Sequence, residues 1–269
     1  MHCHLNPKSS PENLLSWMDA AGVKWCATGV LGFKFGARKT RLKFAEVMGD
    51  RYIPFGGQSD LNAIYVTSQD VSEQNDAENP KFKKIFSLLK KDFEEGRIRG
   101  IGELFLNIST NKKVKMRRKA DINSPAMKAL FALSNEHNGV ITFHTEWDSD
   151  TVEQIDDLMS SANPSARMIL AHCGSNTRPK DVKPLFEKYP NFFCDLSARS
   201  VPKISAKAIV QRPEKKVFGP DGIVPGWKDL IEKMPDRFLV GSDVYDGAKY
   251  AKAIKVIRKG FLGNLSPET

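Results

Sequence analysis

Short apolar runs alternate with helical patterns along this 269-residue chain. This alternation constrains the possible folds more than any other feature of the sequence. The runs are rich in β-branched and aromatic residues, and Gly or Pro separates them. Strands that alternate with helices form a parallel sheet covered by helices. We expect seven strands, at residues 23–30, 52–55, 98–106, 140–144, 168–172, 192–196 and 238–243.

Helix starts are marked by serine and proline. Ser10-Pro11 and Ser124-Pro125 each place a capping serine before a proline at the first helical position. Gly22 and Gly139 stand where the helices that follow these caps should end. The expected helices cover residues 12–21, 80–95, 125–137, 150–161, 180–189, 226–234 and 247–259.

The first five residues, MHCHL, place His2 and His4 one residue apart at the start of the chain. If they end a strand of their own, the strand count becomes eight, which closes a (β/α)₈ TIM-like barrel. An open doubly wound sheet is the alternative, but no glycine-rich phosphate loop is present. We therefore predict a single α/β barrel domain over residues 1–269. The unsupported histidines, and a Ser-Pro-Glu helix start at residues 266–268, predict a barrel truncated at both ends.

Cysteine spacing and apolar runs bear on the setting of the protein. No run approaches the ~18 apolar residues that span a bilayer, so we expect no membrane partner. The four cysteines form no C-x-x-C pair, and we expect them to be buried, unpaired residues of a protein in a reducing, cytoplasmic compartment.

The chain carries a net charge of +9, and part of that charge is clustered. One interpretation is a solvated loop, and the other is a cationic lid that attracts an anionic substrate or nucleic acid. The clustered residues are Lys112, Lys113, Lys115, Arg117, Arg118 and Lys119.

Metal-competent side chains stand at the ends of several expected strands. Alternate residues of a strand share a face, so His2 and His4 should point the same way. In a (β/α)₈ barrel the active site lies at the carboxyl ends of the strands. Four of the five histidines and two carboxylates occupy such ends, whereas His137 lies at a helix end. The six candidate metal ligands are His2, His4, Glu103, His144, His172 and Asp243.

The H-x-H pair, the lone histidines and Asp243 resemble the amidohydrolase superfamily. The segments SPENLLSWMDAAGV, ILAHCG, KYPNFFCDLSAR and DRFLVGSD are similar to its amidohydrolase-related branch along nearly the whole chain. This resemblance implies a metal-dependent hydrolase with one or two divalent ions, zinc first. It implies that Asp243 moves the proton of a metal-activated water, and that His172 is either an acid–base group or, in two-metal members, a ligand of the second ion. Glu103 then either bridges two ions or orients a histidine.

The substrate is the least constrained part of the interpretation. We expect a small, anionic ester, lactone or amide, with Arg199 either pairing with its charge or forming a surface ion pair. A decarboxylase of the same superfamily and a TatD-like deoxyribonuclease are the alternatives, and a metal-binding scaffold is the non-enzyme alternative. TatD-type enzymes carry an acidic residue where this chain has Gly241, so we do not expect nucleic acid to be the partner.

Overall fold

A curved parallel sheet forms the centre of the molecule. The computed structural model describes residues 2–5, 8–68, 70–109, 118–161, 165–200, 216–219, 221–244 and 247–269. Within them, the main sheet has the strand order β1-β2-β3-β4-β5-β6-β9, and every neighbouring pair is parallel. The strands are β1 Cys26–Thr28, β2 Tyr52–Gly57, β3 Gly100–Asn107, β4 Val140–Thr145, β5 Arg167–Ala171, β6 Phe192–Asp195 and β9 Phe238–Leu239.

The N-terminal segment 2–5 joins the two edges of this sheet. On one side, parallel bridges pair His2 with Ala27 and Leu5 with Val30. On the other side, the Ser242 N–H donates to the carbonyl oxygen of His2 at 2.8 Å. The segment therefore occupies the position of an eighth strand, and the partial TIM-like α/β barrel expected from the sequence is confirmed.

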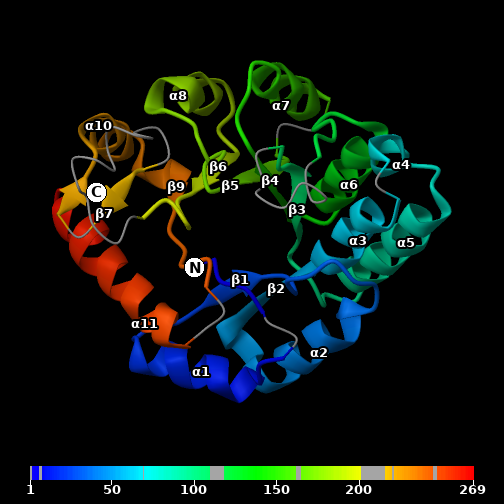
Figure 1. Ribbon diagram of the computed structural model, residues 1–269, viewed down its shortest axis with the longest axis horizontal. Coiled ribbons are helices and arrows are strands. Elements are labelled where there is room, and N and C mark those ends of the chain that lie inside the picture. The colour runs from blue at the N-terminus through cyan, green and yellow to red at the C-terminus, as the bar shows by residue number, and fades with distance from the viewer. Residues whose placement is uncertain are drawn as a thin grey trace.

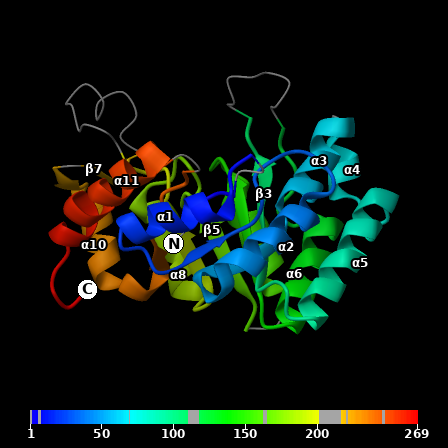
Figure 2. The same ribbon diagram turned by 90° about the horizontal axis from the view of Figure 1, so that it is seen from below.

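Helices surround the sheet as a ring (Figure 1). Figure 1 and Figure 2 both show α11 beside α1, and the two helices are in contact, so the ring meets itself. A small antiparallel pair, β7 Phe218–Gly219 and β8 Gly222–Ile223, lies apart from the main sheet. The helices are α1 Pro11–Ala20, α2 Ala37–Met48, α3 Gln58–Ser68, α4 Val71–Asn75, α5 Pro80–Glu94, α6 Pro125–Glu136, α7 Thr151–Ser160, α8 Pro179–Lys188, α10 Pro225–Lys233 and α11 Gly247–Val256.

Short irregular helices complete the described chain. Three are 3₁₀ turns and one is a π-helix that directly continues α11. They are η1 Gly49–Arg51, η4 Pro235–Arg237, η5 Ile257–Phe261 and η6 Leu262–Asn264. Every helix in the described residues is too short or too polar to span a lipid bilayer.

The predicted helix starts are confirmed at α1 and α6. The Ser10 side chain accepts a hydrogen bond from the Asn13 N–H, and Ser124 accepts one from Met127. In each case proline follows the serine, where its missing N–H costs no hydrogen bond.

Three helices, α2, α3 and α4, were not expected from the sequence. The α2 sequence ARKTRLKFAEVM is strongly cationic, which hides its periodicity. Phe44 and Met48 are nevertheless buried, and a spacing of four residues places them on one helix face. The buried side chains of α2 are therefore Phe44, Met48 and Arg41, and the helix packs against β2.

The expectation of unpaired cysteines was wrong. All four are buried and form disulfides, Cys3–Cys26 with Cα atoms 6.2 Å apart and Cys173–Cys194 with Cα atoms 4.7 Å apart. The partners lie 23 and 21 residues apart in sequence, because each pair joins neighbouring strand positions across a helical connection. Such pairs have no short spacing motif. The pairing also removes the argument for a reducing compartment.

Candidate metal centre

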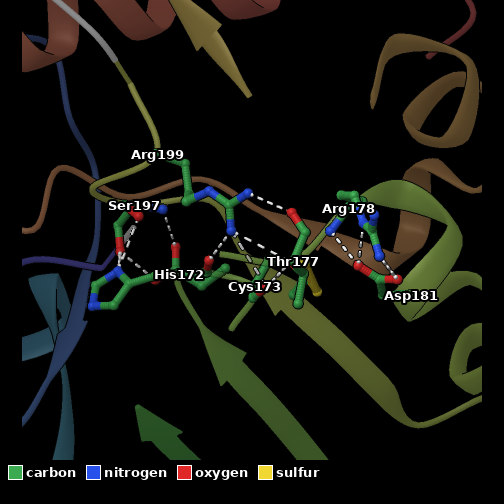
Figure 3. The surroundings of a disulfide bond; sticks show 9 residues. His172, Cys173, Thr177, Arg178, Asp181, Ser197 and Arg199 are labelled. Atoms are coloured by element: carbon green, nitrogen blue, oxygen red, sulfur yellow. Dashed lines mark hydrogen bonds and ion pairs between the residues drawn. A yellow bond between two sulfur atoms is a disulfide. The ribbon is translucent and has the colours of Figure 1, made fainter. Parts of the chain in front are cut away.

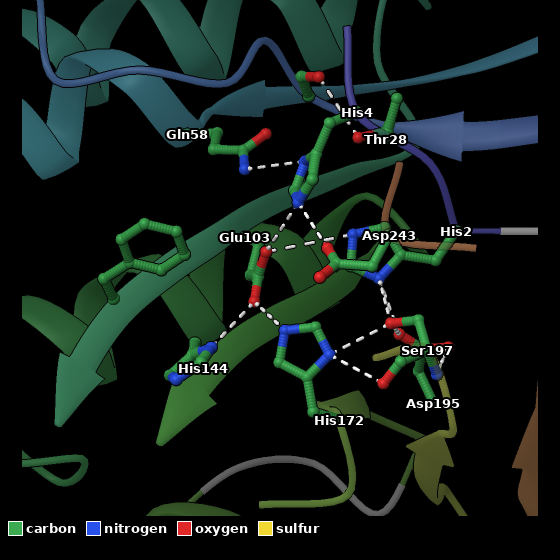
Figure 4. Close-up of polar contacts among 12 residues, drawn as sticks. His2, His4, Thr28, Gln58, Glu103, His144, His172, Asp195, Ser197 and Asp243 are labelled. Carbon is green, nitrogen blue, oxygen red and sulfur yellow. Dashed lines mark hydrogen bonds and ion pairs between the residues drawn. The ribbon is translucent and has the colours of Figure 1, made fainter. Parts of the chain in front are cut away.

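The six candidate ligands lie together at the carboxyl ends of the strands (Figure 4). His2 and His4 come from the N-terminal segment, and Glu103 and His144 come from β3 and β4. His172 directly follows β5, and Asp243 follows β9 by four residues. The fifth histidine, His137, lies elsewhere, with its ring stacked 5.1 Å from that of Phe93.

One group of potential ligands comprises His2, His4, Glu103 and Asp243. Each offers a nitrogen or oxygen atom, and these four atoms all lie within 4.8 Å of one another. His4 Nε2 is 2.7 Å from Asp243 Oδ1 and 3.6 Å from Glu103 Oε2. His2 Nε2 lies 3.8 Å from the same glutamate oxygen. Oxygen and imidazole nitrogen atoms thus surround one position at the barrel axis.

A second group comprises Glu103, His144 and His172. Glu103 Oε1 is 3.3 Å from His144 Nδ1 and 3.1 Å from His172 Nε2. The ligand atoms of these three residues also lie within 4.8 Å of one another. Glu103 therefore belongs to both groups, one carboxylate oxygen facing each.

A local irregularity in β3 aims Glu103 at the centre. The register with β4 shifts between Ile101 and Leu104, which is a β-bulge. Gly102 makes it possible, since its φ is +117° and an added Cβ would meet the backbone oxygen of Thr142. The Asn62 side chain then donates to the Glu103 carbonyl oxygen at 3.1 Å, which holds the bulge in place.

The backbone also turns sharply at two of the candidate ligands. His172 has φ +55° and Asp243 has φ +54°, a region that residues with a Cβ rarely adopt. His172 directly follows β5 and Asp243 lies four residues beyond β9, so in both places the left-handed conformation turns the chain after it has left the sheet. Such conformations persist where the surroundings determine them, and they are common at functional sites.

Opposite charges hold the centre together electrostatically. Burial by itself would raise the pKa of Glu103, but the imidazoles of His172 and His144 hold that pKa well below its usual range. Burial also opposes ionisation of Asp243, yet His172 and His4 lower its pKa to about 2. Burial would lower the pKa of His172, but the carboxylates of Asp243 and Glu103 raise it to about 10. In the metal-free protein at neutral pH, both carboxylates are therefore ionised and His172 carries a proton.

Asp195 and Ser197 are functional candidates that the sequence analysis missed. Asp195 Oδ2 lies 2.5 Å from His2 Nδ1, and its charge raises the pKa of His2 against the effect of burial. Ser197 Oγ lies 3.1 Å from His2 Nδ1 and 3.0 Å from His172 Nδ1. The pair therefore orients two histidines from the side away from Glu103 (Figure 4). A signal was present, because Asp195 ends an apolar run as the predicted ligands do.

The two remaining histidines of the centre, His4 and His144, also have polar neighbours. Gln58 Nε2 lies 3.4 Å from His4 Nδ1, and Ser175 Oγ lies 3.3 Å from His144 Nε2. Side chains that occupy one ring nitrogen fix the orientation of the other, as is usual for metal-binding histidines.

Arg199 packs against the turn that follows β5 (Figure 3). It is 1% exposed, and its guanidinium donates to the carbonyl oxygens of His172 at 2.8 Å and Thr177 at 3.0 Å. The guanidinium also lies 5.3 Å from the centre of the Trp227 ring. These contacts favour a role for Arg199 in positioning His172. They do not favour the two roles that we expected, a substrate contact or a surface ion pair.

Most of the basic cluster lies outside the described residues, namely Lys112, Lys113, Lys115 and Arg117. Of the two described members, Lys119 forms ion pairs with Asp148 and Asp150, at 3.0 Å and 2.8 Å. Arg118 is largely buried. The cationic lid therefore stays a prediction.

Gly241 allows the N-terminal segment to approach the end of β9. A Cβ at this position would meet the Cβ of His2, and would lie 2.8 Å from the His2 carbonyl oxygen. The acidic residue that TatD-type enzymes carry here would collide with a candidate ligand.

Comparison with known proteins agrees with this geometry. The family model described as Amidohydrolase matches residues 79–246. The chain belongs to the amidohydrolase family. It is therefore an enzyme of that superfamily, and the matched region contains Glu103, His144, His172 and Asp243 but not the H-x-H pair. No curated protein sequence matches the chain.

Several solved structures share the fold at low sequence identity. A lactonase from Listeria monocytogenes is 13% identical, with a TM-score of 0.54 over 93% of this chain and 75% of that one. A phosphotriesterase homology protein from Escherichia coli with phosphate in its active site is 13% identical, with a TM-score of 0.53 over 90% and 80%. An amidohydrolase from Burkholderia multivorans with bound HEPES is 14% identical, with a TM-score of 0.51 over 97% and 83%. These similarities concern the fold.

Proposed function

We propose that this amidohydrolase is a metal-dependent hydrolase whose centre is formed by His2, His4, Glu103, His144, His172 and Asp243. The observation that carries the proposal is the position of Glu103. Its carboxylate contributes to two groups of ligand-competent atoms, each within 4.8 Å, and both groups contain histidine.

The ligand atoms of the centre fit a divalent cation. Both oxygens of Glu103 and Oδ1 of Asp243 are buried, and in the described residues they face imidazole nitrogens, at 3.1 Å and 3.3 Å from Glu103 Oε1, 3.6 Å and 3.8 Å from Glu103 Oε2 and 2.7 Å from Asp243 Oδ1. Carboxylate oxygens and imidazole nitrogens are both metal-ligand atoms, so their convergence in a buried position suits a cation. Imidazole and carboxylate ligands together suit Zn²⁺, Mn²⁺, Fe²⁺ or Ni²⁺, and we propose zinc first.

We propose two ions, and Glu103 would contribute a carboxylate oxygen to each. His2, His4 and Asp243 would hold one ion, and His144 and His172 would hold the other. A single ion held by His2, His4, His144 and Asp243, with His172 as an acid–base group, is the simpler alternative. When bound, a divalent ion supplies Lewis acidity, which polarises a carbonyl group and acidifies a water molecule.

The proton transfers fall to Asp243. Its pKa of about 2 keeps the carboxylate ionised, so Oδ2 can accept a proton from the attacking water. The same carboxyl group then returns the proton to the leaving oxygen or nitrogen. His4 Nε2, 2.7 Å from Oδ1, fixes the orientation of the carboxylate during both transfers.

The substrate we propose is a small ester, lactone or amide that carries a carboxylate or phosphate. Hydrolysis of such a bond requires one activated water and one returned proton, which this set of residues supplies. Lactones are the first compounds to test, since one of the proteins that share the fold is a lactonase.

Two measurements on the purified protein test the proposal. The first is metal content per chain, after chelation and reloading with Zn²⁺, Mn²⁺, Fe²⁺ or Ni²⁺. The second is hydrolysis of a panel of lactones, esters, amides, phosphoesters and single-stranded DNA. Asp243→Asn should remove the activity, and Asp229→Asn, an exposed aspartate on α10, is the matched control. A chain that binds no divalent ion would disprove the proposal.

A further inference from the structure

A cavity of about 620 Å³ lies between α2 and α5, over the end of β2. Its size falls within the ~300–1,000 Å³ typical of small-molecule sites. None of the six proposed metal ligands lines it. Both helices belong to the outer ring of Figure 1, and the cavity reaches inward as far as Gln58, whose Nε2 lies 3.4 Å from His4 Nδ1.

Part of the inner wall of this cavity is apolar. Phe55 of β2 and Ile85 and Leu89 of α5 are buried there. At its mouth, Phe35 and Leu88 are 47% and 40% exposed, which is high for large apolar side chains. An apolar hollow with exposed apolar side chains at its edge suits an apolar ligand or partner.

Lysine side chains line the same mouth. Lys81 and Lys84 are three residues apart on α5, so they project from one face of the helix. No ion pair links Lys84 to an acidic side chain of the described residues. Deeper in the cavity, the charge of Asp92 is already balanced by a double hydrogen bond from Arg38 and by an ion pair with Arg41. The net charge of the lining is therefore positive.

We propose that this cavity binds an amphipathic anion, a molecule with one carboxylate or phosphate group and an alkyl or aryl body. The body packs against Phe55, Ile85 and Leu89, and Phe35 and Leu88 cover it. The anionic group lies at the mouth, beside Lys81 and Lys84. Only Asp60 opposes it there among the acidic lining residues, and that carboxylate already accepts a hydrogen bond from the Gly36 N–H at 2.6 Å.

Titration calorimetry with decanoate, below its micelle concentration, tests the proposal. We expect saturable binding of one decanoate per chain, and much weaker binding of decyltrimethylammonium, which has the same tail and the opposite charge. Lys84→Glu should weaken decanoate binding roughly fivefold, the scale of an exposed ion pair. Leu88→Asp should weaken it about tenfold, because it removes apolar cover and adds a negative charge.

Two matched variants separate the cavity from the general surface. Lys90→Glu changes an exposed lysine of the same helix that does not line the cavity, and Leu262→Asp changes an exposed leucine of η6. Both should bind decanoate like the unchanged protein, and melting curves of all four variants check that they fold. Equal binding of the two detergents, or equal binding by Lys84→Glu and Lys90→Glu, would overturn the proposal. So would concentration-dependent dimerisation that Leu88→Asp abolishes, because the cavity would then bind a second copy of the chain.

Discussion

The two groups of the proposed metal centre are supported in different ways. His144 lies in β4, which pairs along its length with β3 and β5. His2 and His4 lie in a segment with two isolated bridges, which pair His2 with Ala27 of β1 and Leu5 with Val30 beyond β1.

Other contacts compensate for the missing ladder around His2 and His4. The Cys3–Cys26 disulfide ties the segment to β1, and Asp195 and Gln58 contact the two imidazole rings. A continuous backbone ladder holds His144, whereas isolated backbone contacts, a disulfide and side-chain contacts hold His2 and His4. Changes to those side chains should therefore affect His2 and His4 first.

The largest expected effect comes from substituting Asp243. Its effect on the reaction rate should not depend on how the two groups of ligands are supported. We expect Asp243→Asn to lower kcat by about 10²- to 10⁴-fold, the usual contribution of a general acid–base group. Steady-state rates on whichever substrate the screen finds measure this effect, with Asp229→Asn as the control. A change in KM alone would assign Asp243 to substrate binding.

Asp195→Asn should distinguish the two groups. The change removes the charge beside His2 Nδ1 and keeps the shape of the side chain. Loss of such an orienting group typically weakens metal binding about 10- to 100-fold. The affinity should fall for the ion held by His2 and His4, and the second ion should stay bound.

Competition titrations with a chelating dye measure the binding of each ion. The control is Asp236→Asn, which changes an exposed aspartate of η4. Equal loss of affinity for both ions would contradict the comparison.

Metal binding should depend on pH through His172. Its pKa of about 10 means that an ion must displace a proton from this ring at neutral pH. Binding to the His144–His172 group should therefore strengthen about tenfold per pH unit from pH 7 to pH 9, with one proton released. Calorimetry in buffers of different ionisation enthalpy counts that proton. A midpoint near 6.5 for His172 in nuclear magnetic resonance titrations of the chelated protein would refute this prediction.

The two disulfides allow the smallest and most closely matched test. They close loops of similar length, 23 and 21 residues, so removing either should cost about 3 kcal/mol of stability by the chain-entropy argument. Their effects on metal binding should differ. Replacing Cys3 and Cys26 with alanine should weaken the His2–His4 group a few-fold, beyond the effect of replacing Cys173 and Cys194. Denaturant melts and metal titrations of both double variants measure the difference.

The sequence predicted the main strands because each is an apolar run bounded by turn residues. It also predicted which side chains meet, since the ends of parallel strands converge at one edge of the sheet. Glu103 was the hardest of these to place, because its direction depends on a bulge that only the contact between Gly102 and Thr142 explains.

Long-range pairings were beyond the reach of the sequence. Asp195 contacts a residue 193 positions away, and no local pattern records that distance. The cysteine pairs depend on which strands are neighbours in the sheet, and the sequence alone does not determine the strand order. The cationic α2 was missed for a different reason, because its two buried apolar residues, Phe44 and Met48, are too few to dominate the pattern.

The glycines at Gly102 and Gly241 have a consequence for how this protein can vary. Neither supplies a functional group, yet a Cβ at either position would collide with Thr142 or His2. In a saturation mutagenesis scan, both should tolerate substitution as poorly as the histidines, alanine included. Selection at these two positions would act on occupied volume rather than on chemistry. A ranking of residues by the chemical reactivity of their side chains would overlook both glycines. A ranking by tolerance to substitution would place them beside Glu103.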